Sequence, residues 1–188
     1  MKNIAVFASG SGSNFQAIIN EIERGELSAH IALLVCDKSE AKAIERAKSH
    51  EIDTFVFNPN AYVSKEEFEQ EIVDELQTRN IEFIVLAGYM RLIGTTLLRS
   101  FEGKIVNIHP SLLPSFPGKD AIGQALLAGV KVTGVTIHYV DEGMDTGQII
   151  AQEAVSVDED ETRETLTTKI QQVEHRLYYK TLKDLLSK

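Results

Sequence analysis

The sequence predicts an α/β fold in which helices cover both faces of a sheet that contains parallel strands. Short apolar runs rich in β-favouring residues occur at 3–8, 31–36 and 54–57, and a helical pattern follows each of them. Residues 81–87 form a continuous apolar run, which is typical of a central parallel strand that is buried on both faces. A chain of 188 residues with 43% hydrophobic content can bury one core, so we expect a single domain.

The remaining elements follow from the same patterns. The helix after Asn14 stops near Gly25, and Ser64 with Glu67 forms a capping box for a helix that ends near Arg79. Residues 133–140 and 148–155 are predicted to be paired strands. The other predicted elements are helices at 39–50, 120–129 and 162–186, and a strand at 105–108.

The acidic composition limits the classes of partner. The formal net charge is −9, from 28 acidic and 19 basic residues, which argues against nucleic acid or an anionic membrane as a partner. The single cysteine, Cys36, excludes an internal disulfide and a multi-cysteine metal site, and it suits a reducing cytosol. We find no pattern of a signal peptide or a membrane span, so we expect a cytoplasmic protein.

A loop rich in glycine and serine follows the first predicted strand. It reads Ser9-Gly-Ser-Gly-Ser-Asn14 and leads into a helix, so backbone N–H groups at the helix start can face an anion. Phe15 occupies the third glycine position of a dinucleotide fingerprint, and the lysine of a triphosphate loop is lacking. A phosphate monoester fits this loop best, and a tight turn capped by Ser13 or Asn14 is the alternative.

A second loop with binding character follows the central apolar strand. Residues 88–94, GYMRLIG, are apolar apart from the cation Arg91 and lie at the carboxyl end of that strand. Ligands of open α/β sheets bind at such ends. Packing of an apolar loop over the sheet edge is the alternative interpretation.

The most informative stretch is residues 105–118, IVNIHPSLLPSFPG. Asn107 is a polar amide at an apolar strand end, and His109 lies two residues further, so both side chains share one face of an extended strand. Three prolines in the next nine residues stiffen the loop, which is useful for presenting a reactive group. A turn cap at Asn107 and a backbone hydrogen bond at His109 are the alternative.

Two acidic residues complete the candidate set. Asp145 lies in the glycine-rich acidic turn at 141–147, and Glu174 lies beside the apolar stripe of the last helix. The five histidines lack metal-binding spacing, and no G-x-S-x-G elbow occurs, so we expect neither a metal nor a serine nucleophile. The set suits acyl transfer between two bound substrates. An amide and an imidazolium stabilise the oxyanion, while an aspartate favours the protonated imidazole and relays a proton.

The motifs NIHPSLLP, GSGSN and GYMRLIG, with the Asp145 loop, closely resemble the phosphoribosylglycinamide formyltransferases, within the wider 10-formyltetrahydrofolate-dependent formyltransferase family. The resemblance runs over essentially the whole chain, in the same order. NIHPSLLP alone is shared with methionyl-tRNA formyltransferase and formyltetrahydrofolate hydrolase. Those enzymes carry an added domain for which this chain has no room.

The resemblance implies a three-layer α/β sandwich with a mostly parallel, Rossmann-like sheet and antiparallel C-terminal strands. It implies a cytoplasmic enzyme, monomeric or homodimeric, that moves the formyl group of 10-formyltetrahydrofolate to the amine of 5-phosphoribosylglycinamide in purine biosynthesis. The half at about 1–100 would bind the ribonucleotide, and the half at about 101–188 would supply catalysis and folate binding.

The resemblance also implies roles for individual residues. Asn107, His109 and Asp145 would be catalytic. Gly12, Ser13 and Asn14 would bind the phosphate and Glu174 the ribose hydroxyls, while the folate would contact Lys65, Met90, Arg91, Leu92, Ile93, Asn107 and Asp141. His138 is a lesser candidate, and Lys119 has no assigned role.

Three other interpretations stay open. A dinucleotide-dependent oxidoreductase would use Gly10, Gly12 and Asp37, although Phe15 argues against it. A non-catalytic folate-binding module would not need the combination of amide, imidazole and carboxylate. Another formyltransferase or a hydrolase that uses 10-formyltetrahydrofolate would share the NIHPSLLP element.

Overall fold

The computed structural model describes all 188 residues, and its centre is one seven-stranded sheet in the order β3-β2-β1-β4-β5-β6-β7. The strands are β1 (Lys2–Ala8), β2 (Ala29–Cys36), β3 (Thr54–Val56), β4 (Phe83–Leu86), β5 (Ile105–His109), β6 (Val132–Tyr139) and β7 (Ile149–Ser156). The first five strands run parallel, whereas β6 is antiparallel to both β5 and β7. The predicted parallel sheet with antiparallel C-terminal strands is therefore confirmed.

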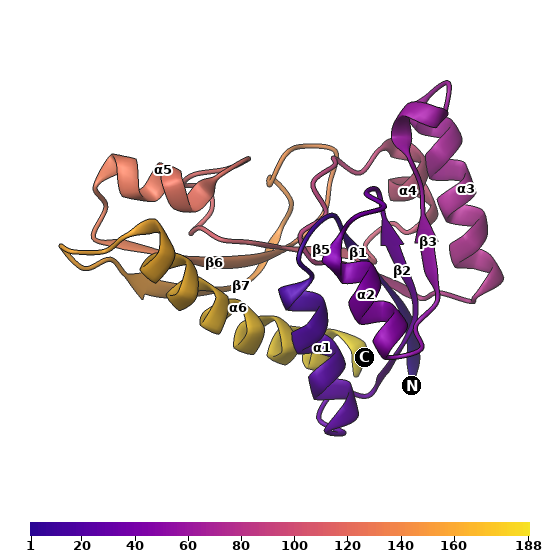
Figure 1. Ribbon diagram of the computed structural model, residues 1–188, viewed down its shortest axis with the longest axis horizontal. Coiled ribbons are helices and arrows are strands. Elements are labelled where there is room, and N and C mark those ends of the chain that lie inside the picture. The colour runs from indigo at the N-terminus through magenta and orange to yellow at the C-terminus, as the bar shows by residue number, and fades with distance from the viewer.

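Helices cover both faces of this sheet (Figure 1). They are α1 (Ser13–Glu23), α2 (Lys42–Ser49), α3 (Lys65–Thr78), α4 (Thr95–Ser100), α5 (Ala121–Ala128) and α6 (Arg163–Leu186), with a short 3₁₀ helix, η1 (Pro59–Ala61). Helices α1, α2 and α6 share one hydrophobic cluster with the sheet, and α3 and α4 share another on the opposite face. This arrangement is the predicted three-layer sandwich.

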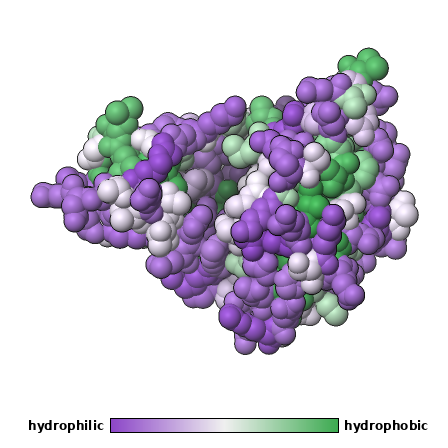
Figure 2. All heavy atoms as spheres, in the orientation of Figure 1, coloured by the Kyte–Doolittle hydropathy of each residue, from purple (hydrophilic) through white to green (hydrophobic).

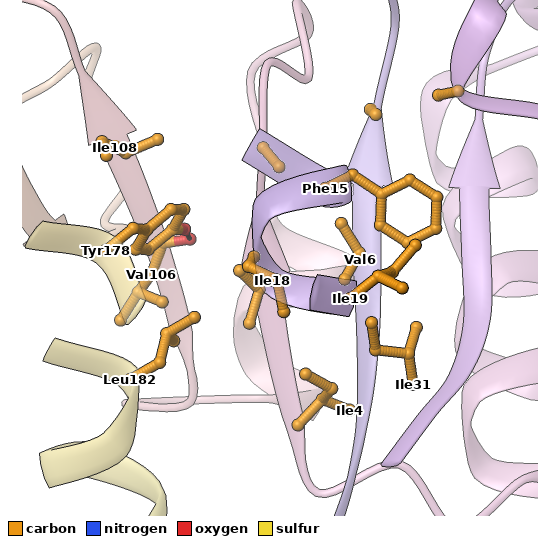
Figure 3. Close-up of a cluster of buried hydrophobic side chains, with 14 of the residues drawn as sticks. Ile4, Val6, Phe15, Ile18, Ile19, Ile31, Val106, Ile108, Tyr178 and Leu182 are labelled. Atoms are coloured by element: carbon orange, nitrogen blue, oxygen red, sulfur yellow. Dashed lines mark hydrogen bonds between the residues drawn. The ribbon is translucent and has the colours of Figure 1, made fainter. Parts of the chain in front are cut away.

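The alternation of side chains along β1 shows why both layers are needed. Ile4 and Val6 belong to the α1–α2–α6 cluster, whereas Ala5 and Phe7 belong to the α3–α4 cluster. All four residues are fully buried, so a continuous apolar run is the pattern that this strand requires. In Figure 3, the apolar face of α1 lies against β1, and Tyr178 of α6 lies beside β5.

The Tyr178 side chain joins α6 to two strands that lead into the candidate site. Its hydroxyl donates to the Leu86 carbonyl at 2.7 Å and approaches the Val106 carbonyl at 3.3 Å. Complete burial raises the pKa of Tyr178 well above its usual value, so the hydroxyl remains a donor. Helix α6 thus fixes the ends of β4 and β5 side by side.

Some local predictions were wrong. Helix α4 and η1 were not predicted, and α2 begins at Lys42 rather than at residue 39 because residues 38–40 form a turn. Ser64 does cap α3 through the Glu67 N–H, but the Glu67 carboxylate accepts from the Val63 N–H rather than from Ser64. The second hydrogen bond of the predicted capping box is therefore made by the N–H of Val63, one residue before Ser64.

The surface in Figure 2 is hydrophilic over most of the visible face, with one apolar patch on α5 at the left and further apolar areas on the right half of the view. Leu127 of α5 is 92% exposed, which accounts for part of this patch. None of the helices is both long enough and apolar enough to cross a bilayer.

Candidate active site

A cavity of about 410 Å³ opens at the carboxyl ends of β4 and β5, where ligands of open α/β sheets bind. Its walls come from the loop after β4, the end of β5, the start of α5 and the acidic loop before β7. The predicted site residues that line it are Asn14, Met90, Arg91, Leu92, Ile93, Asn107, His109, Asp145 and Glu174. The cavity therefore unites both halves of the chain.

Four polar side chains meet at one end of this cavity. Asn107 of β5 lies directly opposite His138 of β6, and its Nδ2 donates to His138 Nε2 at 3.4 Å. The Asp145 carboxylate lies between two imidazoles, 3.5 Å from His109 Nδ1 and 3.7 Å from His138 Nε2. The predicted trio is brought together, and His138 joins it as a fourth member.

The hydrogen bonds of the two imidazoles fix which nitrogen carries a hydrogen. His138 Nδ1 faces the Tyr139 carbonyl at 2.8 Å, and His109 Nε2 faces the Phe116 carbonyl at 2.9 Å. A carbonyl only accepts, so each of these nitrogens is a donor. The opposite nitrogen of each ring faces Asp145.

Asp145 is kept ionised by its surroundings. Burial by itself raises the pKa of Asp145, but its contact with the His138 ring, the hydrogen bond from the Gly118 N–H and the charge of His109 hold that pKa below its usual value. The Gly118 N–H donates to Oδ2 at 2.8 Å. This end of the cavity therefore holds a negative charge beside two imidazoles.

A second part of the cavity wall, made by Asn14 of α1 and Glu174 of α6, holds a carboxylate in a different state. Glu174 of α6 is 8% exposed, and its Oε2 accepts only from Asn14 Nδ2, at 3.3 Å. Burial raises the pKa of Glu174 to about 7, and the Asn14 hydrogen bond offsets part of that rise. Asn14 Oδ1 is buried without a partner, so this acceptor lacks a donor and Glu174 has only one.

The apolar loop after β4 is held by a polar network from β1 and β2. Asp37 accepts from Ser9 Oγ at 2.6 Å and from Arg91 Nε at 2.8 Å, and Ser9 Oγ accepts from the Met90 N–H at 2.9 Å. Asp37 is the acid that the oxidoreductase interpretation would use. Its carboxylate is occupied by Arg91 and Ser9, which argues against that interpretation.

The far end of the same loop is held by α3. Glu69 is 2% exposed and accepts from the N–H groups of Gly94 at 2.6 Å and Leu97 at 3.3 Å, so it caps α4. Burial raises the pKa of Glu69, and these two hydrogen bonds oppose the rise. Met90 and Leu92 project from the fixed loop and are 59% and 49% exposed.

Four predicted binding residues lie outside the cavity walls. Gly12 and Ser13 begin α1, with Gly12 at a positive φ of 71°, and a Cβ there would lie 3.0 Å from Ala43 Cβ. Lys65 lies beside Gly94, 2.9 Å from the position of a Cβ on that glycine. Asp141 closes its own turn by accepting from Gly143 N–H and Thr146 Oγ1.

The sequence did not reveal how His138, Asp37 and Glu69 serve the site. His138 carried a weak signal, an imidazole inside a predicted strand, but its contact with Asn107 depends on the register of β5 and β6. Asp37 and Glu69 act through residues 54 and 25 positions away. No cluster of three or more His, Cys, Asp or Glu side chains has the geometry to hold a metal ion.

Comparisons with known proteins agree with this geometry. Residues 2–182 match the family described as formyl transferase. The chain is 57% identical over 186 residues to phosphoribosylglycinamide formyltransferase of Bacillus subtilis (strain 168), with 99% of this chain and 95% of that protein covered. It is 42% identical over 188 residues to the trifunctional purine biosynthetic protein adenosine-3 of Drosophila pseudoobscura pseudoobscura, which covers 99% of this chain but 14% of that protein.

A solved structure is equally similar. The crystal structure of phosphoribosylglycinamide formyltransferase from Bacillus halodurans has a TM-score of 0.97 at 63% identity, with 100% of this chain and 96% of that chain covered. Sequence, family match and structure agree, which confirms the predicted resemblance and the predicted class of enzyme. The chain belongs to the formyl transferase family.

Proposed function

We propose that this chain transfers the formyl group of 10-formyltetrahydrofolate to the amine of 5-phosphoribosylglycinamide, a step of purine biosynthesis in the cytoplasm. The observation that carries the proposal is the cavity with two different ends. One end places an amide and two imidazoles around an ionised carboxylate, and the other presents the buried, unpartnered Asn14 Oδ1 beside Glu174, which has a single donor.

The Asp145 end supplies the chemistry. The neutral amine attacks the formyl carbon, so a C–N bond forms and the carbonyl oxygen becomes an oxyanion. Asn107 Nδ2 and protonated His109 donate to that oxygen, in the manner of an oxyanion hole. When the oxyanion collapses, the bond from carbon to N10 of the folate breaks, and the proton lost by the amine goes to N10. Asp145 stabilises the imidazolium and assists this proton movement.

The Glu174 end binds the ribonucleotide. A ribose diol offers two O–H donors, one to Asn14 Oδ1, which lacks a donor, and one to Glu174, which has a single donor. The N–H groups at the start of α1 face the phosphate, since Gly12, Ser13 and Asn14 form its first turn. The positive φ of Gly12 shapes that turn, and its close contact with α2 keeps it there.

The folate binds across the fixed loop after β4. Exposed Met90 and Leu92 offer apolar contact to the pterin, and the loop backbone, with Ile93, forms the wall of the cavity. Asp141 shapes the acidic loop opposite, and Lys65 lies outside the cavity, where the glutamate tail would leave. Arg91 contributes by fixing the loop through Asp37.

An absorbance assay for tetrahydrofolate release tests the proposal. We expect release only when 5-phosphoribosylglycinamide and 10-formyltetrahydrofolate are both present, with stoichiometric formylation of the amine. Equal release without the ribonucleotide would identify a hydrolase instead. Release with another amine acceptor but not with the ribonucleotide would identify a different formyltransferase.

A further inference from the structure

The loop that follows β5 is organised around a buried serine. Ser111 is fully buried, and its hydroxyl donates to the Ser115 carbonyl at 2.6 Å and lies 3.3 Å from the Phe116 carbonyl. The Phe116 carbonyl accepts the Nε2–H of His109 at 2.9 Å. The six residues from Ser111 to Phe116 therefore connect the Ser111 hydroxyl to the His109 ring.

The backbone of this turn adopts a conformation that needs support. Phe116 has φ of 54°, in the left-handed region that bulky side chains rarely adopt. Such a residue persists when its surroundings over-determine it. The Ser111 hydroxyl supplies part of that support from inside the turn, because it contacts the carbonyl oxygens of both Ser115 and Phe116.

A second set of hydrogen bonds joins the turn to β6 and β7. Thr136 of β6 donates to the Ser111 carbonyl at 2.7 Å and accepts from the Leu113 N–H at 3.0 Å. Gln152 of β7 donates to the Leu113 carbonyl at 2.9 Å and to Thr136 Oγ1 at 3.0 Å. Both antiparallel strands thus hold Ser111 in place.

We propose that Ser111 is a positioning residue for His109: it sets the Phe116 carbonyl, which holds the ring with hydrogen on Nε2 and leaves Nδ1 for the reacting groups. The ring nitrogen on the side of Asp145 is then the one that faces the substrate. A proton on Nδ1 is stabilised by the Asp145 carboxylate while Nε2–H stays bound to Phe116. This inference rests on the proposed function only for its kinetic part.

Nitrogen NMR of the imidazole in the free protein tests the tautomer directly. In the parent protein we expect the neutral His109 ring to carry hydrogen on Nε2 and none on Nδ1. In Ser111→Ala we expect both tautomers to be populated, with kcat lowered roughly 10- to 100-fold and both KM values within about twofold. A merely structural serine would not change the tautomer of a ring that it does not touch.

Ser115→Ala is the matched control, because it makes the same change four residues away at an exposed hydroxyl that makes no hydrogen bond. We expect it to keep the parent tautomer and rate. Ser111→Cys keeps the side-chain volume with a weak donor and serves if Ser111→Ala does not fold. A parent ring with hydrogen on Nδ1, or a folded Ser111 variant with the parent tautomer and kcat, would overturn the inference.

The two proposals fail in different ways. Full transferase activity in His109→Ala would refute the catalytic role of His109 and leave the tautomer result unchanged. A parent ring with hydrogen on Nδ1 would refute the role of Ser111 and leave the formyl transfer itself intact.

Discussion

The cavity presents two carboxylates, partly buried at Asp145 and buried at Glu174, and their surroundings shift the two pKa values in opposite directions. Asp145 has the Gly118 N–H and two imidazoles around it, so its pKa is lowered despite burial. Glu174 has one amide donor, so burial dominates and raises its pKa to about 7. Pairs of groups separated in this way commonly divide their roles within an active site. We therefore expect Asp145 to act as a charge and Glu174 to accept hydrogen bonds from a ligand.

The largest effect is expected at the Asp145 end, from loss of an oxyanion donor. Asn107→Ala should lower kcat by roughly 10²- to 10³-fold, because one amide N–H no longer reaches the developing oxyanion. Steady-state measurement of tetrahydrofolate release gives this number. Asn60→Ala, at an exposed amide of η1, is the control and should keep the parent kcat. A threefold change in kcat corresponds to only about 0.6 kcal/mol of activation free energy. A kcat within threefold of the parent in Asn107→Ala would therefore remove Asn107 from the mechanism.

A somewhat smaller effect is expected when the charge of Asp145 is removed. Asp145→Asn should fold normally and lower kcat by about 10²-fold, because the neutral amide can still accept from Gly118 N–H but no longer stabilises the imidazolium. Glu142→Gln removes a charge from the same exposed loop and should leave kcat unchanged. Rapid-quench assays on both variants measure the difference, and equal rates would reduce the acidic loop to a packing surface.

At the Glu174 end, the effect should fall on binding. Glu174→Gln should weaken ribonucleotide binding by about 10-fold, since a charge-assisted hydrogen bond to a ribose hydroxyl becomes a neutral one. Folate affinity should be unchanged, and calorimetry with each ligand separately measures both. Equal weakening of the two ligands would show that Glu174 supports the whole cavity instead of the ribose.

The remaining effect is on stability rather than on activity, and its sign follows from the raised pKa of Glu174. The pKa of Glu174 is 4.5 in the unfolded chain and about 7 in the folded protein. The contribution of the protonated Glu174 side chain to the unfolding free energy is therefore full below pH 4.5 and is lost as pH rises to about 7. The loss amounts to about 3 kcal/mol. Denaturant titrations at a series of pH values give the unfolding free energy of the parent and of Glu174→Gln. The plot of this free energy against pH should have different slopes for the two proteins. Exposed Glu159→Gln should not alter the slope, and parallel parent and Glu174→Gln curves would contradict the raised pKa.

Asp145 should show the opposite sign at lower pH. Its lowered pKa means that its contribution is present above the unfolded value of 3.8 and is lost as pH falls through the folded value. The pH dependence of Asp145→Asn relative to the parent should therefore appear only below about pH 4.

The sequence predicted the layers of the fold and the placement of Asn107 and His109 at one strand end, because these depend on local patterns. Apolar runs mark the strands of a sheet that is buried on both faces, and an amide two residues from an imidazole shares its face whatever the rest of the chain does. Local pattern also placed Asp145 in an acidic loop. The residues that Asp145 contacts in the folded protein cannot be predicted from such a local pattern.

The missed features all depend on contacts between distant residues. Helix α4 is only six residues long, and its N–H groups are capped by Glu69 from α3, so its own sequence lacks a start signal. The contact between His138 and Asn107, which are 31 residues apart in the sequence, depends on the register in which β6 pairs with β5. The burial of Glu174, which lay at the edge of a helical stripe in the sequence, depends on how α6 packs against α1.

Single-turnover formyl transfer at saturating concentrations of both substrates tests the division of roles most directly, in the parent, Asp145→Asn and Glu174→Gln. Saturation removes differences in binding, so only the chemical step remains. We predict that Asp145→Asn is about 100-fold slower than the parent and that Glu174→Gln stays within about threefold of it. Equal slowing of both variants, or a fast Asp145→Asn with a slow Glu174→Gln, would contradict the account.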